Sequence, residues 1–291
     1  DGFSVGHHLT FYPDWLDFWR GDEAALLRKF GSREAYTTLY GGTDREALLS
    51  LFRRDLAQAE RLGAKYVVFH VSDVSLEEAY TYQWEHSHRE VLDASIEVLN
   101  LLFGERHYPF ALLVENQWWP GFTFIDPEET GHLLHGIRHP DKGIMLDIGH
   151  LMNTNTALES EAEGIIYIHK MLDEHGELCR FIRGIHLHQS LSGAYVRAST
   201  GKLPGHMAED YLTRFGNSYG HVLQIDRHKP WTDPAIAEAI SRIGPEFLTH
   251  ELSCKNREAR EQVVSCQRAT LKKGGLFLPD GKAAPFGEKM L

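Results

Sequence analysis

The chain has few cysteines, and their spacing does not suit a metal or redox site. Cys179, Cys254 and Cys266 are odd in number, and none belongs to a CxxC motif. This pattern argues against a disulfide framework and against a zinc site built from cysteines. We therefore expect three reduced thiols in a cytoplasmic protein.

Long apolar runs and an excess of positive charge are also missing. No apolar run reaches the ~18 residues that a membrane span needs, and we expect no signal peptide. The formal net charge of -11 has the wrong sign for general attraction to nucleic acid. These absences predict an acidic enzyme that binds a small substrate, without a membrane partner and with nucleic acid not favoured.

What the 291 residues do contain is a series of helical and strand-like segments in alternation. Thr43 and Glu46 have the spacing of a capping box, and apolar residues then recur at helical spacing as far as Gly63. Asp126 and Asp233, each followed by proline, are expected to open further helices. A last helix is expected over about residues 256–272.

Seven segments have the composition of buried strands. They are Phe3–Leu9, Lys65–His70, Phe110–Glu115, Gly143–Asp147, Ile182–His188, His221–Asp226 and Phe247–Glu251. Strands that alternate with helices form parallel sheets, so the sequence predicts an α/β fold, a (β/α)8 TIM barrel. Its first strand is expected upstream of Asp1 or is not recognisable. A doubly wound sheet is the second choice, because no GxGxxG follows a strand. We expect one domain, 1–291, with a C-terminal extension at 274–291.

Nearly every expected strand ends in an imidazole or a carboxylate. These residues are His7 and His8, His70, Glu115, Asp147 with His150, His186 with His188, Asp226 with His228, and Glu251. In a parallel barrel all strand C-termini open to one mouth, so these side chains should converge. A lone histidine there is more often a packing residue, and a lone aspartate often caps a helix. Neither explains the repeated pattern, whose mixed nitrogen and oxygen donors suit Zn²⁺, Mn²⁺ or Fe²⁺.

These strand ends resemble those of the xylose-isomerase-like TIM-barrel superfamily, which includes endonuclease IV and many sugar isomerases and epimerases. The resemblance covers roughly residues 3–252 and lies in the motifs Val68–His70, Leu113–Asn116, Met145–His150, Ile185–Leu187, Asp226–His228 and His250–Glu251. A sugar isomerase of this group would hold one metal ion with Glu115, Asp147, His186 and Glu251. An enzyme similar to endonuclease IV would hold up to three Zn²⁺ or Mn²⁺ ions, and would add His8, His70, His150, Asp226 and His228.

Some features depart from the endonuclease IV pattern. His8 is chosen over His7 because alternation along a strand puts Gly6 and His8 on the same face. Gln189 stands where many relatives carry aspartate, and a long aromatic insertion lies between His8 and His70. Basic loops that would grip DNA are not evident. These departures argue against DNA repair and leave the metal site untouched.

Two reactions follow from this resemblance. The first is hydrolysis of a phosphate ester by several metal ions, with Glu115 as a bridging ligand and Glu251 as a ligand or as the group that orients the nucleophile. The alternative is sugar isomerisation or epimerisation, with Glu115 and Glu251 as acid and base. Trp118, Trp119, His188 and Arg227 are the expected contacts to a small anionic or sugar-like substrate. A barrel that binds metal or sugar without turnover is a third reading.

Overall fold

The computed structural model describes residues 5–104 and 106–277 and contains one sheet of parallel strands. Its strands are β1 (Gly6–His8), β2 (Tyr66–His70), β3 (Ala111–Glu115), β4 (Lys142–Asp147), β5 (Ile182–Leu187) and β6 (Phe247–His250). They lie side by side in chain order, and every neighbouring pair is parallel. This order is the one that repeated strand–helix units produce, so the α/β barrel predicted from the sequence is confirmed.

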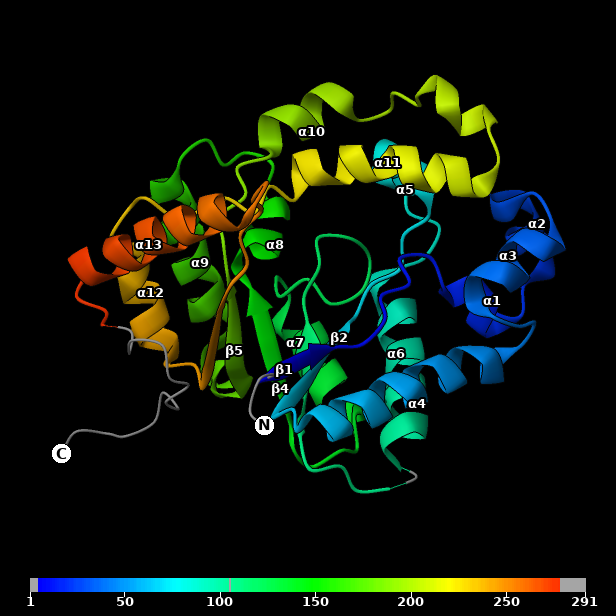
Figure 1. Ribbon diagram of the computed structural model, residues 1–291, viewed down its shortest axis with the longest axis horizontal. Helices are drawn as coiled ribbons and strands as arrows, with labels where there is room; N and C mark the ends of the chain where they lie inside the picture. The colour runs from blue at the N-terminus through cyan, green and yellow to red at the C-terminus, as the bar shows by residue number, and fades with distance from the viewer. Residues whose placement is uncertain (1–4, 105, 278–291) are drawn as a thin grey trace.

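Helices cover the outside of this sheet and one of its ends (Figure 1). They are α1 (Leu16–Arg20), α2 (Glu23–Phe30), α3 (Arg33–Tyr40), α4 (Arg45–Leu62), α5 (Leu76–Thr81), α6 (His88–Gly104), α7 (Pro127–Gly136), α8 (Ile148–Asn153), α9 (Glu161–His175), α10 (Gly193–Ser199), α11 (Tyr211–Ile225), α12 (Ile236–Ile243) and α13 (Arg257–Lys273), with the 3-10 helices η1 (Gly176–Phe181) and η2 (Gly205–Ala208). Helices α10 and α11 lie across the top of the view, and α1 to α3 form a group at its right.

Alternation along each strand separates the barrel interior from the layer under the helices. Tyr66, Val68, Leu113 and Met145 pack together inside, next to Phe247. Their neighbours in sequence belong to the main core beneath the helices. The rings of Tyr66 in β2 and Phe247 in β6 are 4.5 Å apart, so the sheet curls until strands far apart in order meet. Because successive side chains alternate, the last inward position of each strand is fixed by this pattern.

Gly6 shows how tightly the interior is filled near β1. A Cβ atom on Gly6 would lie 2.2 Å from the ring of Tyr66, so only glycine leaves room for that ring. His8 follows two residues later and therefore takes the same inward side as Gly6. The His8 ring lies 5.1 Å from that of His70 and 5.0 Å from that of His186.

One predicted strand is wrong. His221–Asp226 is not a strand: residues 221–225 form the last part of helix α11, which begins after Asp210, whose side chain accepts hydrogen bonds from the backbone of Leu212 and Thr213. A short apolar run fits either element, and here the buried positions Ser218, His221 and Ile225 follow helical spacing. Within the described residues the sheet therefore has six strands, and β5 pairs directly with β6.

Most of the predicted helix ends are found. Asp126 caps α7 with Pro127 at its first turn, and Gly63 ends α4 in the left-handed region with φ 69°. The predicted cap Thr43 is wrong, because the adjacent Asp44 accepts the backbone hydrogen bonds at the start of α4. Asp233 accepts a hydrogen bond from the backbone of Ala235 just before α12. The sequence predicts that the first strand begins at Phe3 and that residues 274–291 form a C-terminal extension. Residues 1–4 and 278–291 lie outside the described part of the chain.

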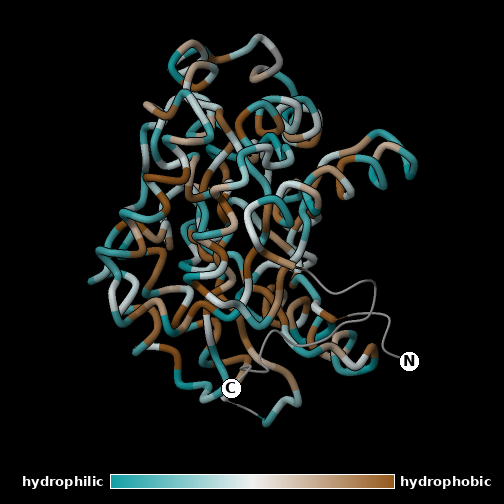
Figure 2. The backbone as a smooth tube through the Cα atoms, turned by 90° about the vertical axis from the view of Figure 1, so that its left-hand side faces the viewer, coloured by the Kyte–Doolittle hydropathy of each residue, from teal (hydrophilic) through white to brown (hydrophobic). Residues whose placement is uncertain are grey.

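The hydropathy of the backbone fits this layered arrangement. Hydrophobic segments lie mostly within the molecule, and hydrophilic ones mostly at its outer turns (Figure 2). Among the described residues, no helix combines the length and apolar character needed to cross a bilayer. The three cysteines are free thiols.

Candidate metal centre

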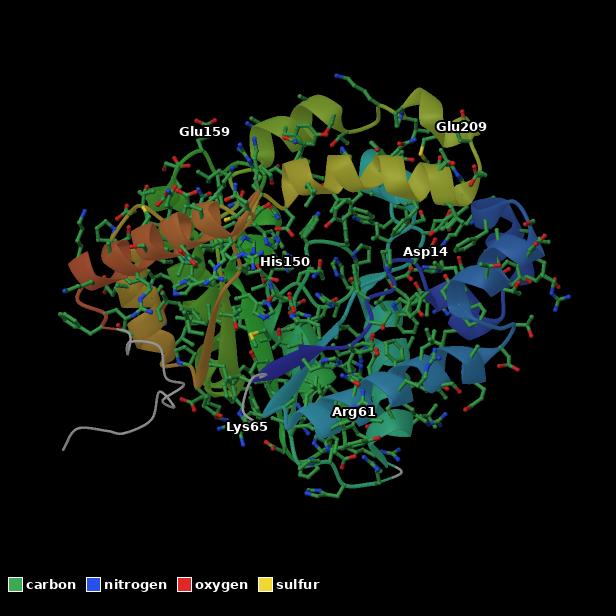
Figure 3. The ribbon with its side chains drawn as sticks, in the orientation of Figure 1. Asp14, Arg61, Lys65, His150, Glu159 and Glu209 are labelled. Atoms are coloured by element: carbon green, nitrogen blue, oxygen red, sulfur yellow. The ribbon has the colours of Figure 1, made fainter. Side chains whose placement is uncertain are left out.

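Imidazoles and carboxylates from the ends of successive strands meet at one end of the barrel. The strand register sets His70 beside Glu115 and Asp147 beside His186. Ligand atoms lie within 4.8 Å of one another in five groups: His150, His188, Asp226 and His228; His8, His70 and Glu115; His8, His186 and Glu251; Glu115, Asp147 and His186; and Asp147, His188 and Glu251. All nine residues predicted as ligands occur in these groups. Figure 3 shows His150 above the strands and below α11.

Glu115 lies at the centre of the groups and is 1% exposed. Its Oε2 is 3.4 Å from His70 Nε2 and 3.9 Å from His8 Nδ1. Its Oε1 is 3.4 Å from Nδ1 of both His150 and His186. The two oxygens of one carboxylate thus face different histidines, which is the arrangement that a bridging ligand requires.

The surrounding histidines keep the buried carboxylates ionised. Burial by itself raises the pKa of Glu115, but His70 and His186 outweigh it and hold that pKa well below its usual range. The pKa of Asp147 is lowered in the same way, since His150 and His188 outweigh the effect of burial. Glu251 differs, because burial raises its pKa. The pKa of Asp226 is also lowered, since His150 outweighs the effect of burial, so three of the four carboxylates are in the form that binds cations.

Several polar atoms of this centre have no hydrogen-bond partner, although they are buried. They are His70 Nδ1, Glu115 Oε2, His186 Nδ1, His188 Nδ1, Asp226 Oδ1 and Glu251 Oε2. Buried polar atoms are nearly always paired, and an unpaired one costs about 1–3 kcal/mol. So many free nitrogen and oxygen atoms in one place fit a divalent cation of the Zn²⁺ or Mn²⁺ kind.

Two residues that the sequence prediction did not select hold the ligands in position. Asn116 Nδ2 donates to the carbonyl of Asp147 at 2.9 Å, and its Oδ1 accepts from the Asp147 N–H at 2.8 Å. Gln117 Nε2 lies 3.1 Å from Nδ1 of His150. Both residues directly follow Glu115, so their position after a ligand strand was a signal that could have identified them.

The expected substrate contacts are placed less uniformly. Trp118 and Trp119 are only 7% and 4% exposed and pack against Val74, Val196 and Ile225, although the Trp118 ring is 5.1 Å from that of His150. Both rings fill the space beneath helices α5, α10 and α11. Because they are covered, neither ring offers an open face on which a substrate could stack.

Arg227 and His188 also differ from a simple substrate contact. Arg227 is exposed, and its Nη1 donates to the carbonyl of Leu191 at 3.2 Å. His188 is fully buried among the other histidines, so it is a member of the centre. The sequence could have indicated this position, because His186 and His188 lie two residues apart and therefore share a face.

The aromatic insertion between His8 and His70 is mostly core. Trp15, Phe18 and Trp19 are buried, so these three rings offer no face to a substrate. Phe11 is the exception that reaches the centre: it is 37% exposed, and its ring lies 4.6 Å from that of His70.

Comparison with known proteins agrees with this architecture. The model of a family described as "Xylose isomerase-like TIM barrel" matches residues 1–266. Among curated proteins, none matches the chain.

Several solved structures resemble the chain at low sequence identity. A D-tagatose 3-epimerase-like protein is 17% identical, with 94% of this chain and 79% of that chain covered and a TM-score of 0.48. The 3-keto-D-glucoside 4-epimerase from E. coli is 10% identical, with coverage of 94% and 98% and a TM-score of 0.40. A xylose isomerase-like TIM barrel protein from Mycobacterium smegmatis, in complex with magnesium, is 15% identical, with coverage of 78% and 68% and a TM-score of 0.42. At these scores, the chemistry of the centre must be inferred from the chain's own residues.

Proposed function

We propose that this chain, which belongs to the xylose isomerase-like TIM barrel family, is a metal-dependent enzyme that hydrolyses a phosphate ester of a small substrate. The observation that carries this proposal is the position of Glu115. One oxygen faces His8 and His70, and the other faces His150 and His186. A single metal ion would need only one of these two sets of histidines, whereas two cations would use both.

The ligands divide into pockets that share members. His8, His70 and Glu115 would hold one cation, and Glu115, Asp147 and His186 would hold a second, with Glu251 nearby at 3.1 Å from His186 Nδ1. His150, Asp226 and His228 belong to a third pocket. Bound cations would supply positive charge to a phosphate and increase the acidity of an attacking water.

The protein's own groups supply positioning and proton transfer. Glu251 is the most accessible carboxylate of the centre, with a side chain 31% exposed, and burial raises its pKa. It can therefore hold or release a proton at Oε2, toward a nucleophile or a leaving oxygen. Glu115 is buried, and its role is to share cations. A net charge of -11 does not favour a polyanion, so a small phosphorylated substrate, drawn by the cations, is the better fit.

The test is hydrolysis of bis(p-nitrophenyl) phosphate and of small phosphate monoesters by zinc- or manganese-loaded protein, with bound metal counted in parallel. Glu115→Gln is expected to lower kcat/KM by about 10²-fold or more and to lower the metal content, because one bridging oxygen is lost. His7→Gln is the matched control, since His7 neighbours His8 on the opposite face. Full activity of Glu115→Gln would overturn the proposal.

A second candidate, sugar isomerisation or epimerisation, is favoured by one observation. Glu115 Oε1 and Glu251 Oε2 approach the same nitrogen, His186 Nδ1, at 3.4 and 3.1 Å. Two carboxylates beside one ligand are suited to moving a proton next to a carbonyl. This reaction needs one metal ion. Exchange of solvent deuterium into a ketose, with one ion per chain and no ester hydrolysis, would select it.

A further inference from the structure

His188 lies in the pocket of His150, Asp226 and His228, and it brings that pocket to four ligand groups. One ligand atom from each of the four residues lies within 4.8 Å of the other three. The His188 ring stacks on His228 at 4.2 Å and meets His150 edge-on at 5.9 Å. The other groups in the centre have three members each. Among the described residues, this is thus the pocket with the most complete ligand set.

The hydrogen bonds of His188 differ from those of a structural histidine. Its Nε2 lies 3.0 Å from the carboxylate of Asp147 and 3.9 Å from Asp226 Oδ1, while its Nδ1 has no partner. The buried His175 pairs both ring nitrogens, with Thr130 and Met171. The nitrogen that faces Asp226 is Nε2, and in the tautomer with the proton on Nδ1 this atom has a lone pair for a cation.

Gly149 explains how this ring reaches its place. A Cβ atom on Gly149 would lie 2.0 Å from Cε1 and 2.3 Å from Nδ1 of His188, a distance that no side chain tolerates. Gly149 is in helix α8, where alanine would otherwise be favoured by about 1 kcal/mol. The position therefore gives up helix stability for space that the His188 ring fills.

His228 gives a second sign that this pocket is constrained. Its φ is +45°, a left-handed conformation that is uncommon outside glycine and costs of order 1–3 kcal/mol. That backbone directs Nε2 to within 2.5 Å of Asp226 Oδ2, and His150 Nε2 lies 3.4 Å from the same oxygen. A strained backbone of this kind persists only where the surrounding residues hold it, as the contacts of His228 with Asp226 do here.

We infer that His188 is the fourth ligand of a closed cation pocket with His150, Asp226 and His228, and that Gly149 is required to admit it. Three nitrogens and one carboxylate would supply four protein ligands, the number typical of structural zinc, whereas catalytic zinc keeps an open position. A cation held there would order this end of the barrel, and substrate would bind at the residues around Glu115. This inference rests on the proposed function only in requiring that the chain binds divalent cations.

The test uses the full chain, loaded with zinc and then dialysed against a mild chelator, with zinc counted by mass spectrometry. Wild-type protein is expected to keep about one ion per chain, because a four-ligand site releases its ion slowly. His188→Gln and Gly149→Ala are expected to lose that ion under the same conditions, and His7→Gln to keep it. Circular dichroism establishes that each variant is folded.

Cobalt gives an independent readout that needs no activity. Four-coordinate Co²⁺ absorbs strongly in the visible, and this band is expected in wild-type protein after dialysis and not in His188→Gln. If His188→Gln retains both the resistant ion and the band, the inference is wrong and the proposed function stands. If wild-type protein binds no divalent metal before dialysis, the proposed function fails as well.

Discussion

Asn116 illustrates how one side chain fixes the geometry of several ligands. Its amide pairs with both backbone polar groups of Asp147 and so ties the end of β3 to the end of β4. Glu115 precedes it, and the backbone carbonyl of Asn116 lies 2.9 Å from His150 Nδ1. The residue binds no cation, but it sets the spacing of three residues that can.

Asn116→Ala is expected to weaken zinc binding by about 10–100-fold, the usual effect of removing a group that orients ligands. Competition with a chromophoric chelator measures it. Asn100→Ala is the matched control, because Asn100 also donates to one carbonyl, that of Gly136, and accepts from one N–H, that of Arg138, away from the centre. Equal zinc affinity of the two variants would contradict the role assigned to Asn116.

His8 and His7 offer the same comparison within one strand. His8→Ala should reduce the number of bound zinc ions by about one per chain, since His8 faces Glu115. His7→Ala should leave the count unchanged, because adjacent side chains point to opposite faces. Equilibrium dialysis with zinc distinguishes the two variants. Loss of zinc from His7→Ala, and not from His8→Ala, would show that His7 is the residue that faces the cations.

Among the helical elements, α1 to α3 are fastened to the barrel by a buried ionic network. Lys29 Nζ lies 2.9 Å from Asp14 Oδ1 and 2.7 Å from Asp17 Oδ2, and its side chain is only 6% exposed. His86 contacts Asp17 at 3.1 Å and Asp73 at 2.9 Å. Figure 3 shows Asp14 between this helical group and the rest of the molecule.

Lys29→Ala is expected to lower the free energy of unfolding by about 3–5 kcal/mol, because it leaves buried carboxylates without their cation. Arg28→Ala, next to it, should cost only about 0–1 kcal/mol, since the Arg28–Glu85 pair is exposed. Urea unfolding followed by tryptophan fluorescence measures both. Equal effects of the two substitutions would mean that the buried network does not stabilise the fold.

The same network gives the stability a dependence on pH. Hydrogen bonds to Asp17 and Asp73 raise the pKa of His86 to about 10, against about 6.5 in an unfolded chain. Below about pH 6.5 both states hold the proton, and the stabilisation is complete. Between about pH 6.5 and 10 the unfolded chain loses the proton first, so the contribution declines and is absent above about pH 10.

The free energy of unfolding should therefore differ more between wild type and His86→Gln at about pH 6 than at about pH 9.5. Chemical unfolding at both pH values measures the two differences. A difference that stays constant or grows with pH would show that His86 is not held as a cation by its two carboxylates.

The helices and strands also show where sequence patterns suffice and where they fail. Short strand-like runs identified β2 to β6, and Asp126, which was predicted to open a helix, caps α7. The run at His221–Asp226 failed because apolar runs this short fit both strand and helix. Only the packing of α11 on α5 and α10 settles the choice, and that packing is a tertiary property.

In the whole molecule, the barrel fold brings together residues that are far apart in the sequence. Seven of the nine predicted ligands, from His8 to Glu251, lie at or just after the ends of parallel strands, and this explains why they meet. His188 was assigned differently, as a substrate contact, because its proximity to Asp226 depends on a loop after α11. Asp226 was predicted at the end of a strand that does not exist, and it reaches the centre from the segment after helix α11.

The shape of the mouth was the least predictable feature. The aromatic insertion was rich in tryptophan and phenylalanine, which suits either a substrate face or a core. In the structure Trp15, Phe18 and Trp19 are buried in the core, and Phe11 lies exposed beside His70. A sequence does not distinguish the two uses, since burial depends on how α1 to α3 pack.

If Glu115 shares cations between its two oxygens, anomalous diffraction from zinc-loaded crystals should locate them. One zinc peak is expected on each side of the Glu115 carboxylate, at about 2.0–2.2 Å from an oxygen, and another peak among His150, Asp226 and His228. A map without a zinc peak at bonding distance from Glu115, or with a single peak there at full occupancy, would contradict it.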